Sequence, residues 1–254
     1  MAEHVVISEA EGIVRFELNR PDKMNSVDNL MARQLLDACE KVDASSTARC
    51  IIVSGRGRAF CGGADLAAAR EQPAEVWVRT VSTVLQRIKS MPCPVITAIH
   101  GYALGLGAGL AMCGDLVIAD ETAKLGFPEV HHGLVPGVIA AAVRPLVSER
   151  ALAELLFIGD KLTAEQARGF GLVSTVVPSG GLAEASEALA RRLMHGSPTA
   201  MRLTKKLMQQ MKDMTSEESY RAGEAAVLVG RETEDAKEGM SAFKERRQPV
   251  WSGR

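Results

Sequence analysis

The chain has 254 residues, of which 46% are hydrophobic and 24% are charged, and its formal net charge is −1. This length supports one large domain or two small ones, and the near-neutral charge offers no overall attraction for nucleic acid or a membrane surface. The five cysteines are scattered without a C-x-x-C pair, and the first residues, MAEHVVISEAEG, lack the pattern of a secretion signal, so we expect a cytoplasmic protein with no disulfide framework, metal site or membrane anchor.

Short apolar runs alternate with helical patterns over the first two thirds of the chain. The runs HVVIS and VRFELN predict paired strands around a turn at Glu11-Gly12, and CIIVSG, PVITAI, LVIAD and LVSTVV predict further strands. Two intervening helices are predicted from apolar residues at helical spacing: Leu30, Met31, Leu35, Leu36, Cys39 and Val42 in the first, and Trp77, Val81, Val84, Leu85 and Ile88 in the second. This succession favours an α/β fold with crossover connections.

From about Leu182 onward the pattern is almost wholly helical. Ser197-Pro198 is typical of a helix start, and Thr215-x-x-Glu218 predicts a capping box. We expect the methionines at 201, 208, 211 and 214 to lie on core-facing sides of these helices. The predicted organisation is an α/β core over residues 1–180 and a helical C-terminal segment over residues 181–254 that packs on a partner subunit.

The stretch HGYALGLGAGLAMCGDL places glycine at 101, 105, 107, 109 and 114. Such a cluster indicates that a phosphate, an oxyanion or another helix approaches the main chain closely. Leu110 stands where a dinucleotide fingerprint needs its third glycine, and the G-K-[ST] of a phosphate-binding loop is absent. Two explanations are left: a helix N-terminus whose N–H groups hold a negative oxygen, or close helix packing alone.

Five motifs in this chain have the order and spacing of the crotonase superfamily: NRPDKMNS, GRAFCGGADL, HGYALGLGAGLAMCGDLVIAD, LGFPEVHHGLVPG and LTAEQARGFGLVSTVVP. Over residues 5 to 250 the chain resembles enoyl-CoA hydratases and isomerases. The resemblance implies a spiral of ββα units, assembled as a homotrimer or a hexamer. It also implies an acyl-CoA thioester substrate whose enolate is stabilised, with no cofactor beyond the CoA of the substrate.

In this family two backbone N–H groups hold the thioester oxygen. Carried over by motif, these are the N–H groups of Ala64 and Leu106. Each such donor typically lowers the barrier by ~3 to 4 kcal/mol. Family members commonly have glycine at the position of Leu106, so the leucine side chain is expected to point away from the thioester.

The acid–base residues depart from the family pattern. Hydratases of the family carry two glutamates; here one position is Gly109, which lines the substrate site without a side-chain acid, and the other is Glu129. The expected activity is hydration of a 2-enoyl-CoA with one glutamate. The alternatives are an isomerase that converts 3-enoyl to 2-enoyl esters, a thioester hydrolase, and a catalytically weak member that binds acyl-CoA.

Further residues are assigned to substrate binding by the same resemblance: Lys23 through its charge, Met24 through its backbone, Gly62, Asp65 and Leu66 in the GGADL segment, and Phe243, an aromatic that closes a neighbouring subunit's acyl tunnel. The alternatives are a solvated surface charge for Lys23 and a core aromatic for Phe243. His131 and His132 are alternative proton carriers. Cys61 is expected to be a small packing residue.

Overall fold

The computed structural model describes residues 2–254 and has a six-stranded sheet at its centre. The sheet order is β1-β2-β3-β4-β6-β9, and its strands are β1 (Val5–Ala10), β2 (Ile13–Leu18), β3 (Cys50–Gly55), β4 (Val95–Ile99), β6 (Leu116–Asp120) and β9 (Thr175–Val177). Only β1 and β2 are antiparallel; the four other pairings are parallel. The α/β prediction is confirmed.

The β1–β2 hairpin confirms the predicted strand pair. Glu11 and Gly12 form its two-residue turn with φ angles of 52° and 76°, between the paired residues Ala10 and Ile13. Positive φ at both central residues gives a turn whose twist matches that of the flanking strands. The predicted strand at LVSTVV is shorter than expected, because only Thr175–Val177 pairs with β6.

Helices α1 (Asn29–Ala44) and α2 (Ala74–Lys89) cover one face of the sheet. Asp28 caps α1 by accepting a hydrogen bond from the Met31 N–H at 2.8 Å. The predicted apolar side of α1 faces the core except for Leu30, which is 37% exposed. All predicted apolar positions of α2 are buried: Trp77, Val81, Val84, Leu85 and Ile88. The strand residues that point to this face of the sheet thus pack against α1 and α2.

The opposite face of the sheet is covered by α7 (Leu182–Met194). Its Ala190 packs with the strand residues that point to this side: Ile13, Cys50, Ile52, Ile96, Ala98 and Ile118. The sheet is therefore enclosed by helices on both sides. Within the described residues, no helix is both long and apolar enough to cross a bilayer.

A smaller sheet lies beside the first and carries the elements around the glycine-rich stretch. Its order is β5-β7-β8, with β5 (Tyr102–Leu104), β7 (Lys124–Gly126) and β8 (Lys161–Thr163). Around it lie α3 (Leu106–Ala111), the 3-10 helix η3 (Pro128–His132), α4 (Gly137–Val143), α5 (Glu149–Ile158) and α6 (Ala164–Gly169). The short strand β5 leads directly into α3.

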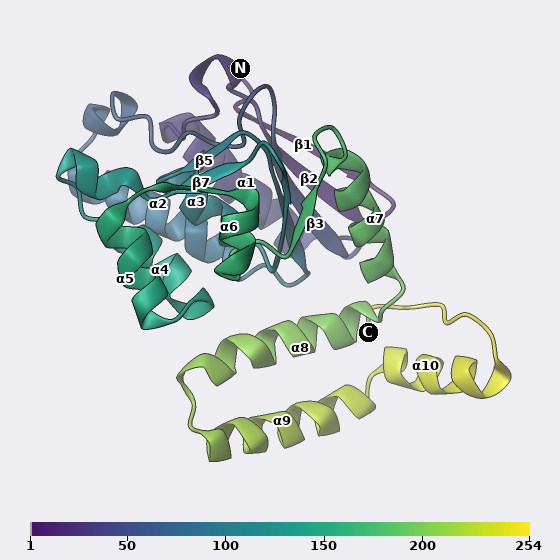
Figure 1. The fold of residues 1–254 in the computed structure, drawn as a ribbon. Coiled ribbons are helices and arrows are strands. Elements are labelled where there is room, and N and C mark those ends of the chain that lie inside the picture. The colour runs from purple at the N-terminus through teal and green to yellow at the C-terminus, as the bar shows by residue number, and fades with distance from the viewer. Residues whose placement is uncertain (1) are drawn as a thin grey trace.

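Helices α8 (Pro198–Gln210), α9 (Ser216–Arg231) and α10 (Glu234–Glu245) form a layer apart from the sheets (Figure 1). The predicted Ser197 cap and the Thr215–Glu218 capping box are present. The layer is attached through the buried Lys205, which donates hydrogen bonds to the Asp115 carboxylate at 2.6 Å and to the Cys93 carbonyl at 3.0 Å. Helix α7 packs on the sheet, and the separate layer begins with α8. The predicted division of the chain into two parts at residue 180 stays a prediction.

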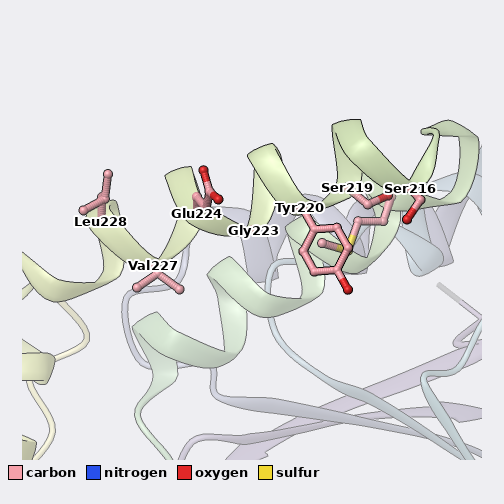
Figure 2. Close-up of a pocket in the computed structure, with 8 residues that line it drawn as sticks. Ser216, Ser219, Tyr220, Gly223, Glu224, Val227 and Leu228 are labelled. Atoms are coloured by element: carbon pink, nitrogen blue, oxygen red, sulfur yellow. The ribbon is translucent and has the colours of Figure 1, made fainter.

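The expected burial is wrong for two of the four methionines in this layer, whereas Met201 and Met211 are partly buried. Met208 is 63% exposed and Met214 is 36% exposed. A groove of about 850 Å³ also opens along α9, lined in part by Met211, Tyr220 and Val227. Figure 2 shows Tyr220, Glu224 and Val227 among the α9 residues that line this groove. The helical periodicity is correct, but within residues 2–254 no element covers Met208, Tyr220 or Val227.

The C-terminal residues are held by one buried carboxylate, Asp235, in the first turn of α10. One oxygen accepts hydrogen bonds from the Ser197 hydroxyl at 2.8 Å and the Thr199 N–H at 3.3 Å. The other accepts from the Ser252 N–H at 2.8 Å and the Gly253 N–H at 3.0 Å. Burial alone raises the pKa of Asp235, but these donors outweigh it and lower the pKa to about 2.

Replacing Asp235 by alanine is expected to lower the free energy of unfolding by ~2 to 4 kcal/mol, because several buried donors lose a charged acceptor. The pKa is lowered, so this stabilisation is complete above the ordinary value of 3.8 and is lost as the pH falls toward 2. Denaturant unfolding as a function of pH checks both effects. Asp213→Ala, at an exposed position, is the control; equal losses in both variants would contradict this role of Asp235.

Candidate active site

Two glycine-rich segments far apart in the sequence lie side by side. The Cys61 N–H donates to the Tyr102 carbonyl at 2.9 Å, and the Leu104 N–H donates to the Cys61 carbonyl at 3.0 Å. These bonds make a parallel bridge between Cys61 and Ala103. The GGADL segment is thereby fixed against the strand that leads into α3.

Glycine is required where these backbones touch. A Cβ at position 107 would lie 2.2 Å from the Cys61 carbonyl oxygen, and a Cβ at position 101 would lie 2.1 Å from the Arg58 carbonyl oxygen. No side chain fits at such distances without moving the main chain. Close packing of the main chain therefore explains the glycines at 101 and 107. Close packing is one of the two explanations that the sequence leaves open for the glycine cluster.

The Ala64 and Leu106 N–H groups have no hydrogen-bond acceptor within residues 2–254. Leu106 is the first residue of α3, where backbone N–H groups have no partner inside the helix. Its side chain is only 8% exposed and faces an apolar interior lined also by Val84 and Leu110. The leucine that departs from the family pattern is thus a core residue, and its N–H remains available.

Glu129 lies next to the start of α3. Its Oε1 is 2.7 Å from the point that a Cβ on Gly105 would occupy, so the carboxylate covers the residue before Leu106. Its Oε2 is buried and has no hydrogen-bond partner among the described residues. Burial raises the pKa of Glu129, while its own backbone N–H and the charge of His132 oppose that rise. A carboxyl group with a raised pKa and an unused oxygen is suited to proton transfer.

Gly109 is buried one turn further along α3. A Cβ at this position would lie 3.3 Å from Ile139 Cγ1 on α4 and 3.4 Å from Leu85 Cδ1 on α2. Sequence reasoning placed Leu85 on a core-facing side of its helix but did not connect it with Gly109, and it did not single out Ile139. The contact depends on how α2 and α4 pack against α3, for which the local sequence has no signal.

The NRPDKMNS segment forms a loop beside the GGADL segment. Lys23 is exposed, Met24 has a left-handed backbone with φ of 49°, and its carbonyl accepts a hydrogen bond from the Gly62 N–H at 2.7 Å. Asp65 forms an ion pair with Arg20 at 3.1 Å. Although burial raises the pKa of Asp65, the Ala68 N–H and Arg20 lower it overall. Of the predicted binding residues, Met24, Gly62 and Asp65 therefore belong to one bonded loop pair. Leu66 follows them and is 56% exposed.

Asn25 supports this loop and was missed by sequence reasoning. Its side chain is fully buried and donates to the carbonyls of Arg56 and Ala59, both at 2.8 Å, while its Oδ1 accepts from the Arg20 N–H at 2.7 Å. The φ of Asn25 is 54°, a region that asparagine adopts more readily than most residues. The sequence signal that could have indicated this supporting role was an asparagine in a loop that also contains proline.

The other residues singled out from the sequence differ in placement: Phe243, His131 and His132 are exposed, and Cys61 is buried at the contact between the two glycine-rich segments. Phe243 is 81% exposed on α10, so its alternative as a core aromatic is wrong, and Figure 1 shows α10 well away from α3. Cys61 is fully buried, and burial raises the pKa of its thiol to about 12 despite hydrogen bonding to backbone. The prediction that Cys61 is a packing residue is confirmed.

Comparison with known proteins gives consistent matches along the whole chain. The sequence model of the enoyl-CoA hydratase/isomerase family matches residues 8–254. The chain is 33% identical to the (E)-benzylidenesuccinyl-CoA hydratase of Thauera aromatica, covering 98% of this chain and 99% of that protein. It is 31% identical to the 1,2-epoxyphenylacetyl-CoA isomerase of Escherichia coli, covering all of both chains.

Among solved structures, the enoyl-CoA hydratase from Bacillus anthracis superposes with a TM-score of 0.95 at 29% identity, covering 99% of this chain and all of that one. The predicted crotonase-like fold is confirmed by this match.

Gly107→Ala is expected to lower the free energy of unfolding by ~1 to 3 kcal/mol, because the added methyl group must displace the Cys61 backbone. The matched control is Gly169→Ala, since position 169 ends a helix and has open space around its Cβ. Alanine there is expected to be neutral or slightly stabilising. Thermal and denaturant unfolding of both variants provide the check, and unchanged stability of Gly107→Ala would show that the two segments are not held in this contact.

Proposed function

The chain belongs to the enoyl-CoA hydratase/isomerase family, and we propose that it adds water to the double bond of a 2-enoyl-CoA thioester. The observation that carries this proposal is the Glu129 carboxylate, with its buried and unpartnered Oε2, beside the first turn of α3. Relatives named as hydratases support the reaction class. The CoA of the substrate is the only coenzyme in this proposal, and the cytoplasm is its proposed location.

In the proposed mechanism the Ala64 and Leu106 N–H groups donate to the thioester oxygen. Glu129 takes a proton from water as the water oxygen bonds to C3. The electron pair of the double bond then moves through C2 to the thioester oxygen, giving an enolate that the two N–H groups stabilise. Glu129 returns its proton to C2, and the product is a 3-hydroxyacyl-CoA. One carboxyl group serves as base and then as acid.

A second candidate reaction is isomerisation of a 3-enoyl-CoA to a 2-enoyl-CoA. It is favoured by the Gly109 environment, where Leu85 and Ile139 fill the space near α3. Here Glu129 removes a proton from C2 and delivers it to C4, so one carboxylate suffices and no water is consumed. The relative named as an isomerase belongs to the same family. A catalytically weak acyl-CoA-binding protein would bind both esters without forming either product.

Binding of the CoA portion is proposed at the loop pair already described. Lys23 is exposed and forms no ion pair within residues 2–254, which leaves its ammonium group to meet a phosphate. Met24 and Gly62 contribute backbone, and Leu66 contributes exposed apolar surface. Asp65 is engaged by Arg20, so its proposed contribution is to fix the loop.

We also propose assembly as a homotrimer or a hexamer through the C-terminal layer. Large apolar side chains are exposed on its helices: Met208, Tyr220, Val227, Leu228, Met240 and Phe243. Exposed apolar surface of this extent is typical of protein interfaces. Phe243, at 81% exposure, is the proposed aromatic that reaches a neighbouring subunit's acyl tunnel.

Sedimentation at micromolar concentration is expected to give a trimer or a hexamer. Charge placed on the exposed layer, as in Val227→Glu combined with Met240→Glu, is expected to shift the protein toward monomer because the charges must lose water on association. A wild-type protein that sediments as a monomer would refute the assembly proposal.

Glu129→Gln is expected to reduce kcat by at least ~100-fold on a 2-enoyl-CoA, because the amide keeps the shape of the side chain but cannot transfer a proton. Affinity for acetoacetyl-CoA, an enolate mimic, is expected to be retained and is measured by calorimetry. The control, Glu154→Gln, changes an exposed carboxylate on α5.

The pH profile gives a second readout for Glu129. Because burial raises its pKa, wild-type kcat is expected to fall at a higher pH than for an ordinary glutamate as the solution is acidified. Full turnover by Glu129→Gln would show that another group transfers the proton, and His131 and His132 would be the next candidates.

A further inference from the structure

Helix α3 lies against the Glu129 carboxylate at its start and against apolar side chains one turn further along. Gly105 and Gly109 are four residues apart, and the Gly109 N–H donates to the Gly105 carbonyl at 2.9 Å, so they lie one helical turn apart. The Gly105 position faces Glu129 Oε1, while the Gly109 position faces Leu85 and Ile139. The carboxylate therefore lies at the N-cap residue of α3, and the apolar pair lies against the same helix one turn further along.

The space beside Gly109 is already filled. Its Cβ position lies 3.3 Å from Ile139 Cγ1, 3.5 Å from Ile139 Cγ2 and 3.4 Å from Leu85 Cδ1. Leu85 and Ile139 are only 4% and 7% exposed, so neither can swing into solvent without opening the core. Even one added carbon is tight here, and a side chain with a carboxylate would also be surrounded by hydrocarbon that cannot solvate its charge.

We propose that Leu85 and Ile139 are specificity-determining residues that close the space beside Gly109 to any second acid–base group, and so restrict the site to the single carboxylate of Glu129. This inference rests on the proposed function of the Glu129 site. Its consequence is that the balance between water addition and double-bond migration is set by two apolar side chains on α2 and α4.

The test compares glycine, glutamate and glutamine at position 109, each with isoleucine or alanine at position 139. Glutamine has nearly the size of glutamate but transfers no proton, so it separates added bulk from added chemistry. Hydration of a 2-enoyl-CoA and isomerisation of a 3-enoyl-CoA are measured in parallel. Ile118→Ala, which opens space on the α7 side of the sheet, replaces Ile139→Ala in the matched control.

With Ile139 in place, Gly109→Glu and Gly109→Gln are expected to lower hydration equally. In the Ile139→Ala background, Gly109→Glu is expected to hydrate at least ~10-fold faster than Gly109→Gln, with no matching gain in isomerisation; this threshold is set below the ~100-fold typical of a well-positioned acid–base group. Equal hydration by the two double variants would overturn the inference. So would the same gain in the Ile118→Ala background.

A smaller substitution tests the same space if the double variants fold poorly. Gly109→Ala adds only the Cβ, and its loss in Tm is expected to be smaller in the Ile139→Ala background, which removes the contacting Cγ1 and Cγ2 atoms, than in wild type. Equal losses in Tm would also overturn the inference. Failure of the proposed function is seen separately, as a wild-type protein that forms neither product from either ester.

Discussion

The candidate site depends on one backbone contact, the close approach of α3 to the carbonyl of Cys61. A Cβ at Gly107 would stand 2.2 Å from that oxygen, so the approach exists only because position 107 has no side chain. It brings the Ala64 and Leu106 N–H groups, from segments about forty residues apart, into one region. Glu129 then needs only the short path from β7 to η3 to reach Gly105.

Much of the fold follows from local patterns in the sequence. The hairpin turn at Glu11-Gly12, the buried side of α2 and the caps at Ser197 and Thr215 are all present as predicted. These features depend on interactions within about one element, where periodicity and turn chemistry dominate. The placement of Glu129 and Gly109 came instead from family resemblance, and composition or periodicity alone would not have found them.

What the sequence could not predict depends on contacts between elements. Ile139 meets Gly109 only because α4 packs on α3, and Asn25 is recognisable as a buried support only once its partners Arg56 and Ala59 are in place. Met208 has the expected helical spacing, yet it is 63% exposed because no other element in the described part of the chain covers it. Periodicity identifies an apolar side of a helix but not the surface that buries it.

The attachment of the C-terminal layer links the far helices to the turn after α3. Lys205 donates to Asp115, and the same carboxylate oxygen accepts the Val95 N–H at the start of β4. Deleting α8 would leave this carboxylate and the Cys93 carbonyl without their shared cation, at a point only a few residues beyond the helix that carries Leu106. The charge on α8 thus ties the outer helices to the short segment between α3 and β6.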